Sequence, residues 1–428
     1  MTRRLPAMIA WACLSAPLLA QAQPSTTVRG QVSVVAVAVP SAPAAAGADD
    51  GALELRTRLS ADWRRTSDRF ILRAAGWVDG LVADRTGTRR QATTLQPQDL
   101  TATLRLPALD LTAGIGQVVW GRLDEVQPTD VVNPLDVSRY FLDGRAEARR
   151  SVALVRARGY LPSGLTADLV YVPVFRPGTF DLLQPATSPF SLAPRDTCVP
   201  GVGCVPVVVR DQTPTTRWRH AQGGGRISGT AGRVDLAVMG WRGFEALPTY
   251  AAAVPGATAV TLLGVHPRTT VIGVDAETVR GAWGLRAEAA WHLDDTFQAT
   301  DRVAAVDGRS VEAGLGVDRR AGDYRVSMSA LVIERRARSA GAAAIDTRDL
   351  QLVSALDRSF AAETRRVRVF AVYNPRDDSA FVRGIASWSP RDGAWIEASA
   401  GWLTGQSTDT LSRLADRDFL SLRLTVGF

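Results

Sequence analysis

The chain has 428 residues with a formal net charge of +7, and 22% of the residues are charged. No stretch after the N-terminal segment is both long and free of charge, so the composition excludes membrane-spanning helices. The small net charge, without a basic cluster that contains aromatic residues, gives no warrant for nucleic-acid binding. The mean hydropathy of -0.00 is compatible with a membrane β-barrel, because a barrel carries its lipid-facing residues at alternate positions.

The N-terminal segment has the features of an export signal. Arg3 and Arg4 precede an apolar run, which contains Cys13 and ends at the small-x-small pattern Ala20-Gln21-Ala22. This pattern predicts a signal peptide over residues 1–22, followed by a single domain over residues 23–428.

The exported chain retains two cysteines, Cys198 and Cys204, on either side of a Val-Pro-Gly-Val-Gly segment. In an oxidising compartment this spacing predicts a small loop closed by a disulfide. A metal site would require further ligands nearby, and the sequence has none. We therefore expect neither a metal nor a cofactor.

Segments with alternating apolar and polar residues follow one another along the chain, which is the pattern of half-buried strands. In chain order the expected strands are 28–39, 53–61, 70–77, 100–106, 109–119, 152–159, 165–175, 218–228, 234–241, 268–274, 283–291, 310–317, 324–334, 350–360, 366–373, 381–388, 395–402 and 419–428.

The connections between these strands alternate between short and long. The longer ones run over residues 81–99, 120–148, 177–217, 242–267, 293–308, 336–348 and 404–418. A soluble sandwich has no reason for this asymmetry, whereas outer-membrane barrels have short periplasmic turns and long extracellular loops. The sequence therefore predicts an all-β fold, a transmembrane antiparallel up-and-down β-barrel of about 18 strands, with an even number from 14 to 18 allowed.

The expected strand 283–291 agrees with this fold in its dimensions. Trp283 and Trp291 lie on one face, roughly 26 Å apart at about 3.3 Å per residue, which suits two aromatic girdles on a tilted strand. The opposite face carries Arg286 and Glu288 and suits a polar lumen. All basic side chains of the chain are arginine, which either a GC-rich coding sequence or a guanidinium-lined lumen explains. The other expected lumen residues are Arg56, Arg58, Arg366, Arg368 and Arg423.

The most distinctive stretch is the connection at 120–148, which begins at the end of VVWG and continues through DVVNPLD. Its expected site residues are Trp120, Asp124, Asp130, Asn133 and Asp136. Two interpretations stand side by side: a constriction loop folded into the lumen opposite arginine side chains, or a structural latch that stabilises the barrel. The carboxylate spacing does not follow a calcium-binding EF-hand loop.

Two stretches resemble known families. VVWG-x-x-D followed by DVVNPxD resembles a Gram-negative outer-membrane barrel family of unknown function, whose members often accompany export systems for lipid-like compounds. The alternating segment 419–428, which ends on Phe428, resembles the closing strand of outer-membrane barrels. These resemblances imply an outer-membrane location in a Gram-negative bacterium. They also imply contact with membrane lipid and lipopolysaccharide, and recognition of the last strand by the barrel-assembly machinery.

The preferred functional hypothesis is a passive channel or transport pore with a polar, arginine-bearing lumen. The alternatives are a conduit for hydrophobic compounds, a structural barrel and a hydrolase. A hydrolase would need a histidine near a nucleophile or carboxylate. Only His292, followed by Asp294 and Asp295, meets this condition, since His220 is expected within a strand and His266 in a long loop. We expect a protein without enzymatic activity; the sequence leaves the solute and the oligomeric state open.

Overall fold

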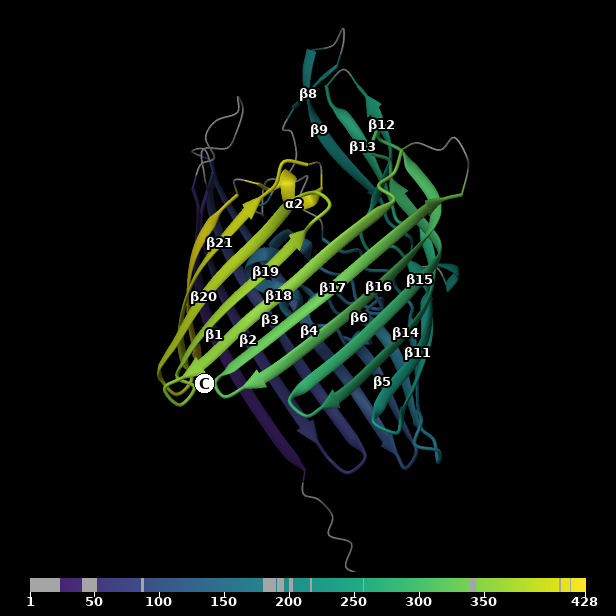
Figure 1. The fold of residues 1–428 in the computed structure, drawn as a ribbon, viewed down its shortest axis with the longest axis vertical. Helices are drawn as coiled ribbons and strands as arrows, with labels where there is room; N and C mark the ends of the chain where they lie inside the picture. Colours follow the sequence, from purple (N-terminus) through teal and green to yellow (C-terminus); the bar gives the residue numbers. More distant parts are fainter. Residues whose placement is uncertain are drawn as a thin grey trace, which may run out of the picture.

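The computed structural model describes residues 24–40, 52–85, 88–179, 190, 196–199, 203–215, 218–256, 258–338, 344–407, 409–415 and 417–428. Within these residues an 18-stranded antiparallel sheet closes on itself, because β1 (Ser25–Val39) pairs with both β2 (Ala52–Thr66) and β22 (Phe419–Gly427). The tilted strands form a barrel (Figure 1). The predicted fold and strand number are confirmed. The predicted signal peptide lies outside the described residues.

The other barrel strands follow in chain order and pair with their neighbours around the ring. They are β3 (Phe70–Arg85), β4 (Thr88–Leu106), β5 (Leu109–Gly116), β6 (Val152–Tyr160), β7 (Thr166–Val172), β10 (Gln222–Ala231), β11 (Val234–Phe244), β14 (Arg268–Arg280), β15 (Trp283–Gln298), β16 (Ala305–Ala321), β17 (Tyr324–Ala337), β18 (Arg348–Phe360), β19 (Arg365–Asn374), β20 (Ser379–Arg391) and β21 (Ala394–Thr404).

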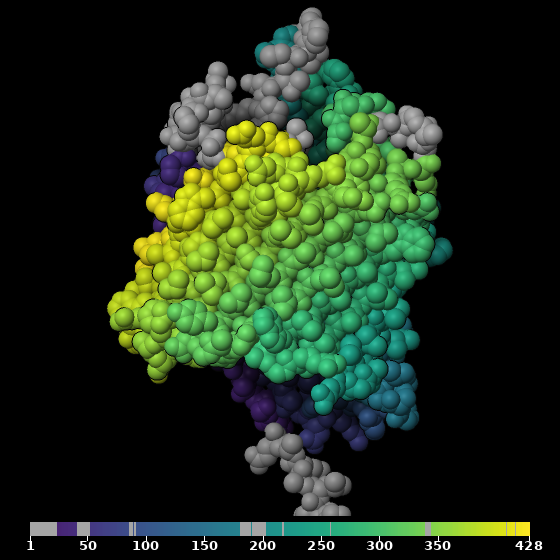
Figure 2. All heavy atoms as spheres, viewed as in Figure 1, coloured from purple at the N-terminus to yellow at the C-terminus, as the bar shows by residue number. Residues whose placement is uncertain are grey.

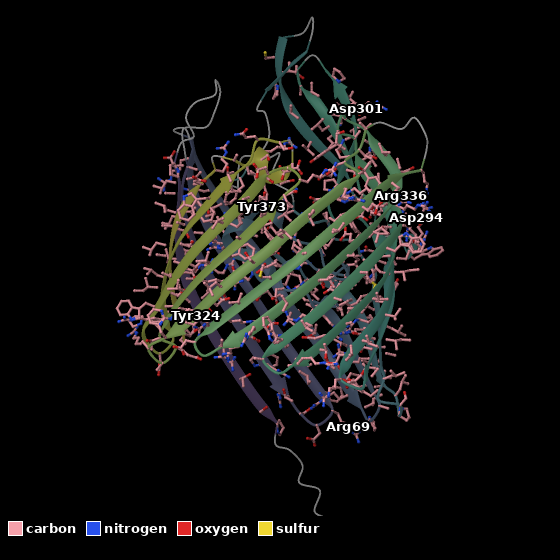
Figure 3. The ribbon with its side chains drawn as sticks, viewed as in Figure 1. Arg69, Asp294, Asp301, Tyr324, Arg336 and Tyr373 are labelled. Carbon is pink, nitrogen blue, oxygen red and sulfur yellow. The ribbon has the colours of Figure 1, made fainter. Side chains whose placement is uncertain are left out.

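The outer surface of the barrel is apolar. Leu420, Leu422 and Leu424 of β22 are exposed, as the alternation predicts, and the wall of later strands forms a continuous surface (Figure 2). Exposed tyrosines lie at both ends of this belt, Tyr324 towards the short turns and Tyr373 towards the long loops (Figure 3). An apolar band with aromatic residues at both borders is the surface that outer-membrane barrels of Gram-negative bacteria present to lipid.

The connections differ from the prediction at several points. Residues 81–99 are not a long loop, since β3 and β4 continue as a paired hairpin up to Arg85 and from Thr88. Alternation continues there, and the ladder hydrogen bonds satisfy the backbone. The predicted strands 109–119 and 165–175 are too long, because β5 ends at Gly116 and β7 at Val172, where the chain leaves the wall.

The long loops at 177–217 and 242–267 contain a second, four-stranded sheet at the upper end of the barrel in Figure 1. Its order is β12 (Thr249–Pro255), β13 (Val260–Val265), β9 (Gly203–Gln212) and β8 (Asp196–Val199), with β13 parallel to β9. The register of β8 and β9 places Cys198 opposite Cys204, and the disulfide between them stays a prediction.

Within the described chain, short helices occur only in the connections between strands. Trp218–His220 forms the 3-10 helix η3, so the prediction that His220 lies within a strand is wrong; the helix precedes β10. Thr410–Arg413 forms α2 between β21 and β22. Among the described residues no helix has the length and hydropathy to cross a membrane.

Candidate functional site

Residues 117–151, here called the inner loop, connect β5 to β6 and lie within the barrel. The inner loop contains the 3-10 helix η1 (Val137–Arg139) and helix α1 (Tyr140–Ala148), which is kinked at Gly144, where φ is +75°. Its side chains reach inward-facing residues of β2, β14, β15, β19 and β22. Because these strands lie on different sides of the ring, the inner loop crosses the lumen.

Most of the site residues predicted in this loop form contacts that stabilise the conformation of the loop itself. Asn133 joins the two ends: its Oδ1 accepts from Val118 N at 2.7 Å, and its Nδ2 donates to Arg150 O at 2.8 Å. Asp130 accepts from Arg145 at 2.9 Å and from Arg149.

Two further predicted residues stabilise the loop: one within the loop itself, the other by packing against the barrel wall. Asp136 caps η1 by accepting from Ser138 N at 3.1 Å. Trp120 is buried edge-on against Trp241 of β11, with ring centroids 6.0 Å apart. Of the five predicted loop residues, only Asp124 is well exposed, and it lies 3.2 Å from Arg286 of the wall.

One side of the inner loop is bound to β2 and β22. Arg56 donates to the two oxygens of Asp143 at 2.7 and 2.5 Å, and Arg58 donates to Glu147 at 2.7 Å. Arg423 of β22 donates to Glu147 at 3.1 Å and to Asp143 at 3.3 Å. Three predicted lumen arginines therefore converge on two carboxylates of α1.

A second layer supports this cluster from the wall and from η1. Asp79 of β3 accepts from Arg58 at 2.7 Å, and Glu54 of β2 accepts from Arg139. Burial by itself raises the pKa of Asp143, but the charges of Arg56, Arg139 and Arg423 outweigh it and hold that pKa well below its ordinary range. Asp143 is therefore ionised throughout the physiological pH range.

The opposite side of the inner loop is bound to β14 and β15. Glu288 is 3% exposed, and its carboxylate accepts four hydrogen bonds from the loop. The donors are the backbone amides of Arg122, Leu123 (2.5 Å) and Thr129 (3.3 Å), and the hydroxyl of Thr129 (2.9 Å).

Arg122 strengthens the same attachment through its side chain. Its guanidinium donates to Asp275 and, at 2.9 Å, to Glu277, both on β14. Arg226 of β10 also donates to Asp275 at 2.9 Å. The predicted lumen residue Arg286 contacts Glu277 at 3.1 Å and Asp318 at 2.8 Å, which continues the network along the wall.

The remaining predicted lumen arginines lie on β19. Arg368 donates to Glu125 of the inner loop at 3.2 Å, which is a third attachment point. Burial raises the pKa of Glu125, although the charge of Arg368 acts in the opposite direction. Arg366 lies over the ring of Trp395, 4.9 Å from its centroid.

Two cavities lie on either side of the inner loop. The upper chamber, at the long-loop end, has a volume of about 800 Å³ and is lined among others by Glu125, Tyr140, Phe141, Glu312, Asp349 and Phe370. The smaller lower cavity, of about 230 Å³, lies towards the short turns and is lined among others by Arg73, Asp99 and Arg156. The two cavities differ in charge, because the upper one is rich in carboxylates.

The predicted grouping of His292 with Asp294 is wrong, whereas Asp295 lines the upper chamber together with His292. Asp294 points away and pairs with Arg338 at 2.7 Å; it is labelled at the outer edge of Figure 3. Asp295 accepts from Ser310, and neither aspartate hydrogen-bonds to His292 among the described residues. A β-bulge lies between His292 and Asp295, so adjacency in the sequence does not decide on which face each side chain lies.

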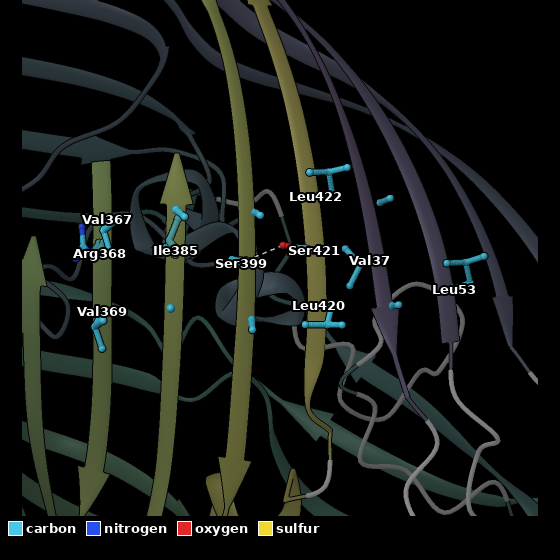
Figure 4. Close-up of a pocket in the computed structure, with 16 residues that line it drawn as sticks. Val37, Leu53, Val367, Arg368, Val369, Ile385, Ser399, Leu420, Ser421 and Leu422 are labelled. Carbon is cyan, nitrogen blue, oxygen red and sulfur yellow. Dashed lines mark hydrogen bonds between the residues drawn. The ribbon is translucent and has the colours of Figure 1, made fainter. Parts of the chain in front are cut away.

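The outer wall has a hollow of its own, of about 670 Å³ (Figure 4). Small side chains of β1, β20 and β21 form its floor, and Leu420, Leu422 and Val369 border it. Ser399 and Ser421, joined by a 2.7 Å hydrogen bond, lie at its base between β21 and β22. This hollow is bordered by exposed leucines of β22, which belong to the apolar outer surface.

No protein-family model and no curated protein matches this chain. Among solved structures it is similar to Pseudomonas aeruginosa OccK2 (OpdF) in complex with glucuronate, with a TM-score of 0.50 and 11% identity over 94% of this chain and 97% of that chain. It is also similar to Pseudomonas aeruginosa OccK7 (OpdD), with a TM-score of 0.49 and 10% identity over 95% and 98% of the two chains. An anion-selective porin from Comamonas acidovorans gives a TM-score of 0.44 and 13% identity, covering 95% of this chain and 100% of that chain. At such identities the likeness to OccK2 shows a shared barrel fold.

Proposed function

We propose that the protein is a passive outer-membrane channel for small polar solutes, narrowed by its inner loop. The observation that carries this proposal is the attachment of one loop to opposite sides of the lumen. Asp143 is held by Arg56 and Arg423 on one side, and Arg122 is held by Asp275 on the other. A loop fixed in this way divides the lumen into two chambers with a constriction between them.

The chemistry of the lumen supports a path for polar solutes. Charged groups are costly to bury without partners or water, so a lumen lined by arginines and carboxylates favours hydrated solutes over apolar ones. The wall strands alternate apolar residues outward and polar residues inward, which is the arrangement of barrels with aqueous channels. The likeness in fold to OccK2, which was solved with glucuronate, is compatible with this class of solute.

The proposal is tested by reconstituting purified protein in planar lipid bilayers. A channel gives discrete conductance steps that depend on the protein. Protein that is correctly folded yet silent contradicts a channel and favours a structural barrel closed by its inner loop. Liposomes loaded with neutral sugars of increasing size then measure the diameter of the constriction.

The alternative function is a conduit for hydrophobic or lipid-like compounds. It is suggested by the resemblance of the VVWG and DVVNPLD segments to an outer-membrane barrel family found beside export systems. Such a conduit requires an apolar lumen and a lateral opening. The ionic lumen and the unbroken ring of paired strands, β1 with β22 included, favour the polar channel. Faster transfer of an apolar dye than of a polar solute would support the conduit instead.

A hydrolase is the least favoured function. His292 is the register partner of Ser310, but the Ser310 hydroxyl donates to Asp295, and the nearest ion-pair partner of His292 is Glu312 at 3.9 Å. A serine nucleophile activated by histidine needs a hydrogen bond between the two. An ester- or peptide-hydrolysing activity that is present in the wild type and lost in the His292→Ala variant would support a hydrolase instead.

The membrane partners follow from the outer surface. We propose that the exposed leucines of β22 face lipid and lipopolysaccharide, and that the same strand is the one recognised by the barrel-assembly machinery. Replacing Phe428 with Ala should then slow assembly into membranes without changing the folded barrel.

A further inference from the structure

The carboxylates of the upper chamber differ from those that attach the inner loop. Asp143 and Asp275 pair with arginines, and Glu288 accepts four hydrogen bonds from the loop. Five carboxylates that line the upper chamber have no arginine within ion-pair distance among the described residues. They are Glu245, Asp295, Glu312, Asp349 and Asp409.

These five side chains come from five different parts of the chain. Asp295, Glu312 and Asp349 lie on β15, β16 and β18, while Glu245 follows β11 and Asp409 precedes α2. Their hydrogen bonds come mainly from neutral groups: Asp349 accepts from Asn374 at 2.9 Å, and Asp409 accepts from Ser379 at 2.7 Å. The negative charge of the chamber is therefore not cancelled by arginines, although burial raises the pKa of Glu245 to about 7 and leaves that carboxyl partly protonated near neutral pH.

The two arginines of the chamber do not cancel it either. Arg145 is bound by Asp130 at 2.9 Å, and Arg335 lies 3.6 Å from Asp346. Each of these arginines thus pairs with a carboxylate other than the five and acts on Glu312 only from beyond ion-pair distance. The chamber keeps a surplus of negative charge inside a wall that is partly shielded from solvent, where charges act more strongly than in water.

Unused hydrogen-bonding atoms lie in the same chamber wall. Glu245 Oε1 and both ring nitrogens of His292 are buried without a hydrogen-bond partner among the described residues. A carboxylate oxygen accepts hydrogen bonds, and a neutral imidazole has one nitrogen that accepts and one that donates. A ligand with N–H donors therefore satisfies the carboxylate oxygen and one of the two ring nitrogens.

Aromatic rings complete the chamber. Tyr140 and Phe141 of the inner loop and Phe297 and Phe370 of the wall are among its lining residues. Aromatic faces attract cations and also pack against alkyl groups. No group of three or more His, Cys, Asp or Glu in the described chain is arranged to hold a metal ion. Carboxylates, aromatic rings and a volume of about 800 Å³ together suit an organic cation.

We propose that the upper chamber is a binding site for organic ammonium ions, that is, for amines with an apolar body. The ammonium group lies against the unpaired carboxylates, and the alkyl part lies against the aromatic rings. This inference rests on the proposed channel for how an amine reaches the chamber and for its role as a substrate. Binding itself requires only the folded barrel.

The first experiment measures binding directly, by calorimetry on the full chain in detergent micelles. The probes are n-butylammonium, n-butanol and n-butyrate, which share an alkyl body and differ in charge. We expect butylammonium alone to bind. The double variant Glu312→Gln with Asp349→Asn should weaken that binding at least tenfold. Asp307→Asn, an exposed carboxylate on the outer face of β16, is the matched control and should leave binding unchanged.

Folding of each variant is checked by the migration of unheated protein in gels, and Asp349→Asn alone serves if the double variant fails to fold. Equal binding of butylammonium and butyrate, or unchanged binding in a folded chamber variant, overturns the inference. Conductance in bilayers separates the two proposals. A conducting protein that binds no amine overturns this inference and leaves the channel intact, whereas a silent protein that binds butylammonium supports the site and contradicts the channel.

Discussion

Glu288 is the residue whose replacement tests the attachment of the inner loop most sharply. Its carboxylate accepts four hydrogen bonds from the loop, three of them from backbone amides, and the side chain is 3% exposed. In Glu288→Gln one oxygen becomes an amide nitrogen, which cannot accept from the backbone amide of Thr129. Hydrogen bonds to a charged group contribute about 1.5–3 kcal/mol each, so losing one and weakening the others costs about 3 kcal/mol.

A loss of about 3 kcal/mol changes an equilibrium constant by roughly 100-fold. We expect the inner loop of Glu288→Gln to leave the lumen more often, so that single-channel recordings show frequent excursions to a higher conductance. Glu334→Gln is the matched control, because Glu334 is exposed and pairs only with surface arginines among the described residues. A correctly folded Glu288→Gln channel with the conductance distribution of the wild type refutes the attachment.

Four further predictions concern stability, charge and the outer surface. Arg56→Ala leaves the buried Asp143 carboxylate with fewer partners and should lower the free energy of unfolding by about 3–5 kcal/mol, measured by urea denaturation in detergent. Burial raises the pKa of Glu245 from 4.5 to about 7. The folded protein then holds a proton that the unfolded chain releases, so stability falls as pH rises from about 4.5 to 7, and Glu245→Gln should remove that slope in unfolding midpoints. Leu422→Arg places a charge on the lipid face and should cost about 2–4 kcal/mol near the bilayer midplane, whereas an equal cost for the adjacent inward Ser421→Ala would contradict this orientation. Cys198→Ser should make the β8–β9 hairpin more sensitive to protease while barrel unfolding stays unchanged, and mass spectrometry without reductant should find the bond to Cys204.

The barrel could be predicted because alternation is a local property. The segment 283–291 shows this: Trp283 and Trp291 lie outside and Glu288 inside, as the two-residue period requires. The period does not show where a strand leaves the membrane, so it predicts a loop over residues 81–99, where β3 and β4 continue as a hairpin. The period also fails at a β-bulge, such as the one between His292 and Asp295.

The partners of the lumen residues could not be predicted, since they depend on the path of the inner loop. Arg56 meets Asp143 across 87 positions of the sequence, and Glu288 meets Arg122 across 166. The acidic stretch at 120–148 marked the loop as unusual, but several of its most conspicuous residues, such as Asn133, only stabilise its fold. Asp143 and Glu147, which bind the wall, lie on either side of the kink at Gly144, so regular helical spacing does not account for their convergence on Arg423.

The central claim is that the barrel conducts small polar solutes past the inner loop. Single-channel recording of the purified full chain in planar bilayers tests it most directly. We predict discrete conductance steps in wild-type protein, with larger steps after Glu288→Gln. A folded protein that leaves the bilayer as resistive as lipid alone, in both forms, would contradict the claim.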